Sequence, residues 1–154
     1  MLEKMEIEEK IQALYDKDDK IAYQSLLNLE EIAEKSNETY AYFDKFLSML
    51  THEKSFIRVR GFRLICKNAK WDKKNKINQT INQILPELDD EKPTAVRQCL
   101  AALKEIVVNK KEVNPIIKEK LCRLNYLAYK DTMQGLLWKD TEEILNLIKE
   151  QEKG

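Results

Sequence analysis

The stretch PTAVRQCLAALKEIV, residues 93–107, repeats the stretch DKIAYQSLLNLEEIA, residues 19–33, at an offset of 74 residues. Five positions are identical between the two, namely Gln24 and Gln98, Leu26 and Leu100, Leu29 and Leu103, Glu31 and Glu105, and Ile32 and Ile106. Half of that offset, 37 residues, places Val59-Arg60 opposite Val96-Arg97. A period near 37 residues is typical of stacked helical hairpins, in which each unit buries its apolar face against its neighbours. The repeat therefore predicts an all-α architecture.

Apolar residues at helical spacing predict about nine helices along the chain. The expected ranges are Glu3–Tyr15, Ile21–Lys35, Thr39–Leu50, Phe56–Trp71, Lys76–Leu88, Thr94–Asn109, Asn114–Tyr129, Asp131–Trp138 and Asp140–Glu152. The first eight form four hairpins in this prediction, and the ninth is a terminal helix that caps the stack.

The loop and helix around residues 91–106 resemble the second helix of a HEAT repeat. A loop acid, Glu91, is followed by Val96-Arg97 and then by small or aliphatic residues at helical spacing, and Val59-Arg60 occupies the same place one unit earlier. The resemblance implies an armadillo-type fold, a right-handed α-α superhelix of about four HEAT-like hairpins. It also implies a scaffold that binds partners on the concave face formed by the second helices. In such repeats the arginine, here Arg60 or Arg97, usually pairs with a carboxylate of an adjacent unit.

Length and composition favour one helical domain, and the charge is unevenly spread along it. The 154 residues include only three Gly and three Pro, so long helices with short loops are expected over a single domain, residues 1–154. The 27 basic and 27 acidic residues cancel, so bulk charge indicates neither nucleic acid nor membrane. Residues 1–53 nevertheless carry −7, residues 54–85 carry +8 and residues 86–154 carry −1.

The N-terminal sequence and the cysteines favour a cytoplasmic protein. Acids interrupt the apolar residues of MLEKMEIEEK, which argues against a secretory signal, and no stretch approaches the 18 apolar residues typical of a membrane span. Cys66, Cys99 and Cys122 lie far apart and form no CxxC motif. Three widely spaced thiols suit a reducing compartment better than a disulfide framework.

The excess of positive charge gathers on one side of a single expected helix. On a helical wheel of residues 56–74 the cations fall within about 80° of arc, and no acid interrupts residues 55–70. These cations are Arg60, Arg63, Lys67, Lys70 and Lys74. The 37-residue period adds Arg97 and Lys104 from the next unit. The pattern predicts a basic strip across the middle two hairpins.

We expect a non-catalytic scaffold that binds an acidic segment of a protein partner. The expected contact residues are Arg60, Arg63, Lys67, Lys70, Arg97 and Lys104, extended by Tyr23 and Gln24 of the first unit. The alternative is weak binding of nucleic-acid phosphates by the same strip, without sequence preference. A homodimer in which the acidic first third of one chain covers the basic region of another is a third possibility. The strip can also be a solvated face, or be neutralised by the acidic third within the molecule.

The sequence contains no pattern that indicates an enzyme, a metal or a cofactor. The single histidine, His52, lies in a polar loop without a nearby Cys or His, and no Gly-rich phosphate loop, nucleophile elbow or HExxH motif occurs. The pairs Asp18-Asp19 and Asp89-Asp90 precede expected helices, so we interpret them as helix caps rather than as catalytic carboxylates.

Overall fold

The computed structural model describes residues 4–153, which form eight α-helices and no strand. The helices are α1 (Lys4–Ala13), α2 (Asp19–Lys35), α3 (Phe43–Met49), α4 (Ser55–Lys67), α5 (Lys76–Ile84), α6 (Pro93–Asn109), α7 (Asn114–Arg123) and α8 (Asp131–Lys153). Short 3-10 helices adjoin them at Glu38–Tyr42, Ala69–Trp71, Leu85–Asp89 and Lys111–Val113. The predicted all-α class is confirmed. Within the described residues no helix is long and apolar enough to cross a membrane.

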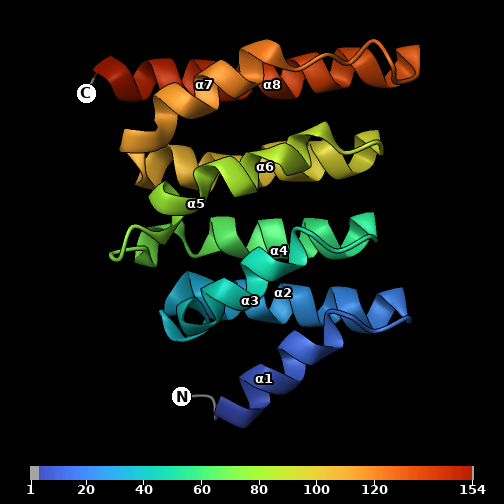
Figure 1. Ribbon diagram of the computed structural model, residues 1–154, viewed down its shortest axis with the longest axis vertical. Helices are drawn as coiled ribbons and strands as arrows, with labels where there is room; N and C mark the ends of the chain where they lie inside the picture. The colour runs from blue at the N-terminus through green and yellow to red at the C-terminus, as the bar shows by residue number, and fades with distance from the viewer. Residues whose placement is uncertain (1–3, 154) are drawn as a thin grey trace.

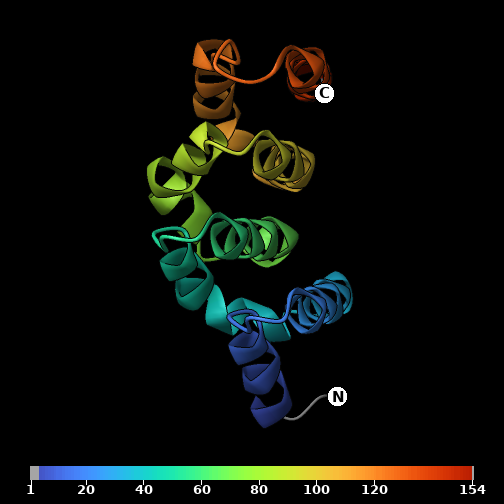
Figure 2. The same cartoon turned by 90° about the vertical axis from the view of Figure 1, so that its right-hand side faces the viewer.

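The helices form two layers (Figures 1 and 2). The even-numbered helices α2, α4, α6 and α8 lie side by side and run in the same direction, with their N-terminal ends at the right-hand edge of Figure 1. The odd-numbered helices form the second layer, and α1, α3 and α5 each rise toward the even-numbered helix that follows in the chain. In Figure 2 the exposed side of the even-numbered helices is gently concave. We call this side the inner face.

The core lies between the two layers and between successive helices, because each helix has its apolar residues on one side. In α6 the side chains of Val96, Cys99, Leu103, Ile106 and Val107 are all buried. Their spacing of three or four residues places them on one stripe of the helix. The four leucines that the sequence repeat aligns are buried as well, which are Leu26, Leu29, Leu100 and Leu103. The repeat thus identified core positions correctly.

Helices α3 and α4 approach each other closely at Gly61. A Cβ atom on Gly61 would lie 2.7 Å from the Cβ of Met49 and 2.7 Å from the carbonyl oxygen of Phe46. Such distances are too short for a side chain of any size. Glycine at this position therefore allows the backbones of the second hairpin to come into contact.

The structure corrects the prediction at the C-terminal end. The helix expected over Asn114–Tyr129 ends at Arg123, and the segments expected as two helices on either side of Lys139 form the single helix α8. No Gly or Pro breaks the chain there, and Asp140 pairs with Arg97 instead of capping a new helix. The predicted separate capping helix was therefore wrong. The first expected helix begins at Glu3, which lies outside the described residues.

Helix α8 lies at one end of the described stack (Figure 1). Lys139, Glu142 and Asn146 are exposed at helical spacing along it, whereas Leu137, Ile144 and other side chains on its opposite side are buried. Its exposed residues also include the large apolar side chains of Leu136 and Trp138.

Candidate functional site

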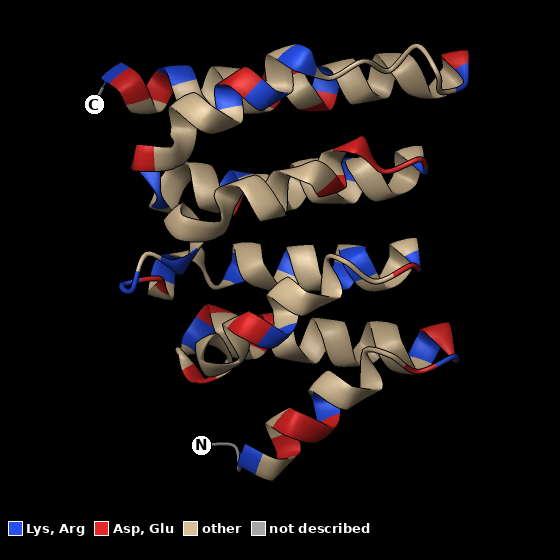
Figure 3. Cartoon of the chain, viewed as in Figure 1, with Lys and Arg blue, Asp and Glu red and all other residues tan. Residues whose placement is uncertain are grey.

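The cations of the predicted strip come from the middle of the molecule. Figure 3 shows Lys and Arg along α4 and the segment that follows it. Helix α1 contains three Glu and two Lys. Arg60, Arg63 and Lys67 project from α4, and Arg97 and Lys104 project from α6. The basic residues of the predicted strip thus lie on two neighbouring inner helices. Their ion pairs determine which of these charges a ligand can reach.

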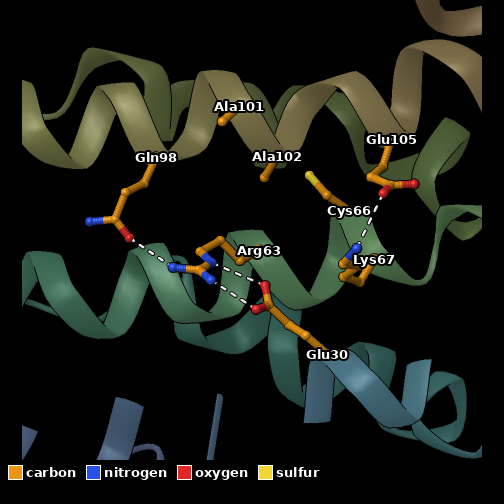
Figure 4. A pocket seen from close by; sticks show the side chains of 8 residues that line it. All are labelled: Glu30, Arg63, Cys66, Lys67, Gln98, Ala101, Ala102 and Glu105. Carbon is orange, nitrogen blue, oxygen red and sulfur yellow. Dashed lines mark hydrogen bonds and ion pairs between the residues drawn. The ribbon is translucent and has the colours of Figure 1, made fainter. Parts of the chain in front are cut away.

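Carboxylates of the neighbouring inner helices already hold the centre of the strip (Figure 4). Arg63 donates two hydrogen bonds to Glu30 of α2, of 3.0 Å from Nε and 2.8 Å from Nη2. Lys67 donates to Glu34 of α2 at 2.9 Å and to Glu105 of α6 at 3.3 Å. The hydrogen bond with Glu34, the largest contribution, raises the pKa of Lys67. Both cations thus tie α4 to its neighbours.

The same arrangement continues to the last inner helix. Arg97 donates to Asp140 of α8 at 2.7 Å, and Lys104 donates to Glu143 of α8 at 3.0 Å. Lys70, just beyond α4, lies 3.2 Å from Glu34 of α2. Every junction between neighbouring inner helices therefore contains at least one ion pair. The possibility that acids of the N-terminal third neutralise the strip within the molecule agrees with these contacts for Glu30 and Glu34.

Arg60 lies deeper than the other cations and has a different environment. Its side chain is buried, and Nη1 donates to the main-chain oxygen of Leu14 at 2.8 Å. Its nearest carboxylate, Asp19, is 3.6 Å from Nη2 and 84% exposed. The guanidinium also lies over the ring of Phe56, 4.9 Å from its centroid. Arg60 is therefore fixed in position but only loosely paired.

The two polar residues expected from the first unit are placed differently. Tyr23 lies beside the strip, because the guanidinium of Arg63 is 5.8 Å from the centroid of its ring. Gln24 donates to Asn28 of its own helix at 3.1 Å. Within residues 4–153 no hydrogen bond joins Gln24 to the basic residues. Tyr23 thus belongs to the candidate site, and Gln24 lies next to it.

Three open hollows lie along the inner face and share Gln98 in their walls. The central hollow, of about 440 Å³ between α4 and α6, contains two cations and two carboxylates, which are Arg63, Lys67, Glu30 and Glu105. The hollow between α6 and α8, of about 270 Å³, is also balanced, with Arg97, Lys104, Asp140 and Glu143. In both hollows the cations and carboxylates neutralise each other, so neither hollow favours a ligand of one charge.

The third hollow, which we call the N-terminal hollow, is not balanced. It lies near the N-terminal ends of α2, α4 and α6, measures about 280 Å³, and is lined by Arg60 and Lys92 but by no carboxylate. Its walls include the rings of Tyr23 and Phe56, which are 49% and 38% exposed. Cations beside exposed aromatic rings are thus concentrated at one end of the inner face.

The chain was compared with protein families, with curated proteins and with solved structures. None of the three comparisons gave a match. The charges and aromatic rings of the inner face therefore carry the functional inference.

A buried carboxyl pair that the sequence did not reveal lies behind the N-terminal hollow. Arg58 donates to Glu87 at 2.8 Å and to Asp90 at 2.9 Å, and Ser55 donates to Asp90 at 2.8 Å. Asp90 also accepts from the amide of Lys92 at 2.9 Å. Lys92 is itself the N-cap of α6 and no side chain of the described residues caps this helix, so the predicted capping role of Asp90 was wrong. Arg58 and Ser55 lie about 30 positions before the two carboxyl groups in the sequence, and no local sequence pattern joins them to the pair.

The two carboxyl groups have opposite pKa shifts. Burial, together with the adjacent Asp90, raises the pKa of Glu87 to about 8. Burial acts against ionisation of Asp90 too, but hydrogen bonds from Glu87, Lys92, Ser55 and Arg58 lower its pKa to about 2. The pair thus holds one proton at neutral pH, which matches a single arginine between two carboxyl groups.

Two of the three thiols are buried, and that of Cys122 is exposed. Burial raises the pKa of the Cys66 and Cys99 thiols, so both stay protonated at neutral pH. Within residues 4–153 no group of three or more His, Cys, Asp and Glu side chains is arranged to hold a metal ion.

Proposed function

We propose that this chain is a non-catalytic scaffold that binds an acidic segment of a protein partner on its inner face. The observation that carries the proposal is the charge of the N-terminal hollow, where Arg60 and Lys92 have no carboxylate among the lining residues. Lys54 is exposed close by, with Nζ 5.7 Å from the centroid of the Phe56 ring. A carboxylate of a partner would there form charge-assisted hydrogen bonds that the protein itself does not supply.

For the fold, we propose a right-handed α-α superhelix of about four HEAT-like hairpins. The pairs α1/α2, α3/α4, α5/α6 and α7/α8 support it, since the second member of each lies on the inner face (Figure 2). The contact of Arg60 with Asp19, where the loop meets α2, fits the paired arginine of such repeats, whereas Arg97 pairs with Asp140 in the interior of α8. Scaffolds of this kind suit the cytoplasm, and three free cysteines support that compartment.

The test uses two lysines that hold no ion pair within residues 4–153, Lys54 and Lys92. The double variant Lys54→Glu/Lys92→Glu reverses the charge around the hollow without breaking an ion pair between described residues, and it removes only the contact of Lys54 with the Phe56 ring. Reversing Arg63 and Lys67 instead would disrupt the ion pairs with α2 and confuse binding with stability. The matched control is Lys139→Glu/Lys149→Glu, which makes the same change in net charge on the exposed side of α8.

The measurement is affinity capture from lysate by wild type, variant and control, each with and without nuclease. We expect a protein that wild type and control retain, that the Lys54/Lys92 variant loses, and that nuclease does not release. Identical captures by wild type and variant would contradict the proposal. Release by nuclease would assign the hollow to nucleic acid, and the logarithm of that affinity should then fall with the logarithm of salt at about −0.9 per phosphate contacted on duplex DNA.

A further inference from the structure

The N-terminal hollow combines an apolar lining with its positive charge. Tyr23 comes from α2 and Phe56 from α4, and both rings are about half exposed. Between them the lining includes Leu26, Val59 and Ala95, which are buried side chains of three successive inner helices. An apolar group that entered the hollow would therefore be surrounded by carbon on several sides and would cover the exposed area of two rings.

The hollow is small and shallow. Its volume of about 280 Å³ lies at the lower end of the range of about 300–1,000 Å³ that is usual for ligand pockets, and it is open to solvent. Sites of this size and shape are filled by a single anchoring residue of a peptide, with charged groups at the rim.

Arg60 lies buried in the wall of the hollow, where its guanidinium can hold a carboxylate next to such an anchor. Arg60 is kept in place by Leu14 and stacks on Phe56, while its one carboxylate contact, with exposed Asp19, is 3.6 Å long. Lys92, at the N-terminal end of α6, also lines the hollow and has no ion pair within the described residues. A fixed guanidinium loses little freedom on binding, so it discriminates well for a carboxylate.

A path for the rest of a bound segment leads away from the hollow past Gln98. Its Oε1 accepts from Arg63 at 3.0 Å, and Figure 4 shows the amide nitrogen pointing away from Arg63. Within residues 4–153 that nitrogen donates to no other group, so it is available to a main-chain carbonyl. Because Gln98 lines all three hollows, it lies where an extended segment would pass from one to the next.

Resting on the proposed function, we infer that the N-terminal hollow receives one large apolar side chain of the partner, inserted between Tyr23 and Phe56. A carboxylate within one or two residues of that anchor binds Arg60 and Lys92. The partner is accordingly an extended, acidic peptide segment that contains an aliphatic or aromatic residue, rather than a uniformly acidic tract.

The test is selection of a displayed library of random nine-residue peptides on the immobilised full chain. We expect the enriched sequences to contain one large apolar residue beside Asp or Glu. The best of them is made as a fluorescein-labelled peptide, and it should bind the variant Tyr23→Ala/Phe56→Ala at least tenfold more weakly than wild type. A version of the peptide with alanine at the anchor should bind the wild-type protein at least tenfold more weakly than the original peptide. Phe56→Leu, which keeps an apolar wall, should retain binding within about threefold.

The control is Ile116→Ala, which removes an exposed apolar side chain of similar accessibility from α7 and should leave the affinity unchanged. Thermal unfolding of each variant separates lost binding from lost folding, and the exposure of both rings predicts that the variants fold. One outcome would overturn this inference and leave the scaffold proposal intact. In that outcome the enriched peptides are acidic without an apolar residue, they bind Tyr23→Ala/Phe56→Ala normally, and they fail to bind Lys54→Glu/Lys92→Glu. Selection of no acidic peptides would overturn both.

Discussion

Two positions in this protein tolerate few other residues. At one there is no room for a side chain between two helices, and at the other a carboxyl group is shielded from water. Gly61 allows the backbones of α3 and α4 to come into contact, and Glu87 is enclosed with Asp90 around the single cation of Arg58. Both positions belong to the scaffold behind the inner face rather than to its exposed surface. Changes at them should therefore alter stability and leave the charges of the N-terminal hollow in place.

The two helical glycines provide a matched pair of substitutions. Gly61→Ala places a methyl group 2.7 Å from Met49 Cβ and from the Phe46 oxygen, so we expect it to lower the free energy of unfolding by about 1–3 kcal/mol. Gly135→Ala meets no atom within 4 Å and removes backbone freedom from α8, so it should raise the free energy of unfolding by about 0.5–1 kcal/mol. Urea unfolding measures both. Equal effects of the two substitutions would contradict the close approach of α3 and α4.

The raised pKa of Glu87 predicts a stability that falls with rising pH. The Glu87 carboxyl group ionises near pH 4.5 in the unfolded state and at about pH 8 in the folded state. Between these two values the folded state therefore binds more protons than the unfolded state. The free energy of unfolding should fall by up to about 1.4 kcal/mol per pH unit between these values. Asp90 has a lowered pKa and acts in the opposite sense, but its stabilisation is lost only as pH falls from about 3.8 toward 2.

Glu87→Gln tests the assignment, because the amide keeps the shape of the protonated carboxyl group and cannot ionise. We expect the free energy of unfolding of the variant to exceed that of wild type by an amount that grows from pH 5 to about 8 and is constant above, as measured by urea unfolding from pH 5 to 9. The control Glu142→Gln changes an exposed acid on α8 and should leave the wild-type pH dependence in place. Parallel profiles for wild type and Glu87→Gln would mean that Glu87 is already ionised in the folded protein.

At the scale of the elements, the inner helices are aligned by ion pairs of unequal environment. The pair of Arg63 and Glu30, between α4 and α2, is bidentate, and its side chains are only 17% and 13% exposed. The pair of Lys104 and Glu143, between α6 and α8, has 43% and 47% exposure. A shielded bidentate pair contributes more to stability than an exposed lysine pair, which water and salt screen. Loss of the Arg63–Glu30 pair should therefore lower the free energy of unfolding, and loss of the Lys104–Glu143 pair should have little effect.

A charge swap at the α2/α4 junction tests this difference. Arg63→Glu faces Glu30 with a like charge, so we expect a loss of about 2 kcal/mol, and Glu30→Arg in addition should restore part of it. The coupling energy from the double-mutant cycle should lie within about 0.5–3 kcal/mol. The same cycle on Lys104 and Glu143 should give less than about 1 kcal/mol. Additive effects of the Arg63 and Glu30 changes would show that the pair does not hold the two helices together.

At the scale of the whole molecule, the sequence predicted what depends on short spacings and missed what depends on contacts between distant segments. The 37-residue period and the apolar spacing predicted the helical class and core positions such as Leu100 and Leu103, because the side of a helix follows from its own residues. The carboxylate partners of the basic strip could not be found in this way, since Glu30 and Asp140 belong to other helices. For the same reason the sequence predicted the start of a helix at Asp140, which lies inside α8, and did not reveal that Lys92 has no ion pair within the described residues.

The two-layer stack also predicts how local stability is distributed. Helices α4 and α6 have inner-face neighbours on both sides, whereas α1 packs at the end of the stack against α2 (Figures 1 and 2). In a stack held together by contacts between neighbours, amide hydrogen exchange should therefore be slowest in α4 and α6 and fastest in α1.

Two substitutions of buried side chains, one at each position in the stack, test this distribution. Ile7→Ala removes a buried contact of α1 and should speed exchange in α1 while leaving α6 and α8 unchanged, because the lost contact lies at one end. Leu103→Ala creates a cavity in α6 worth about 2–5 kcal/mol and should speed exchange in α4 and α8 as well. Hydrogen exchange resolved by helix measures both. If Ile7→Ala speeds exchange equally in all helices, the molecule unfolds as one cooperative unit, and the N-terminal hollow would then share the stability of the whole chain instead of that of its own three helices.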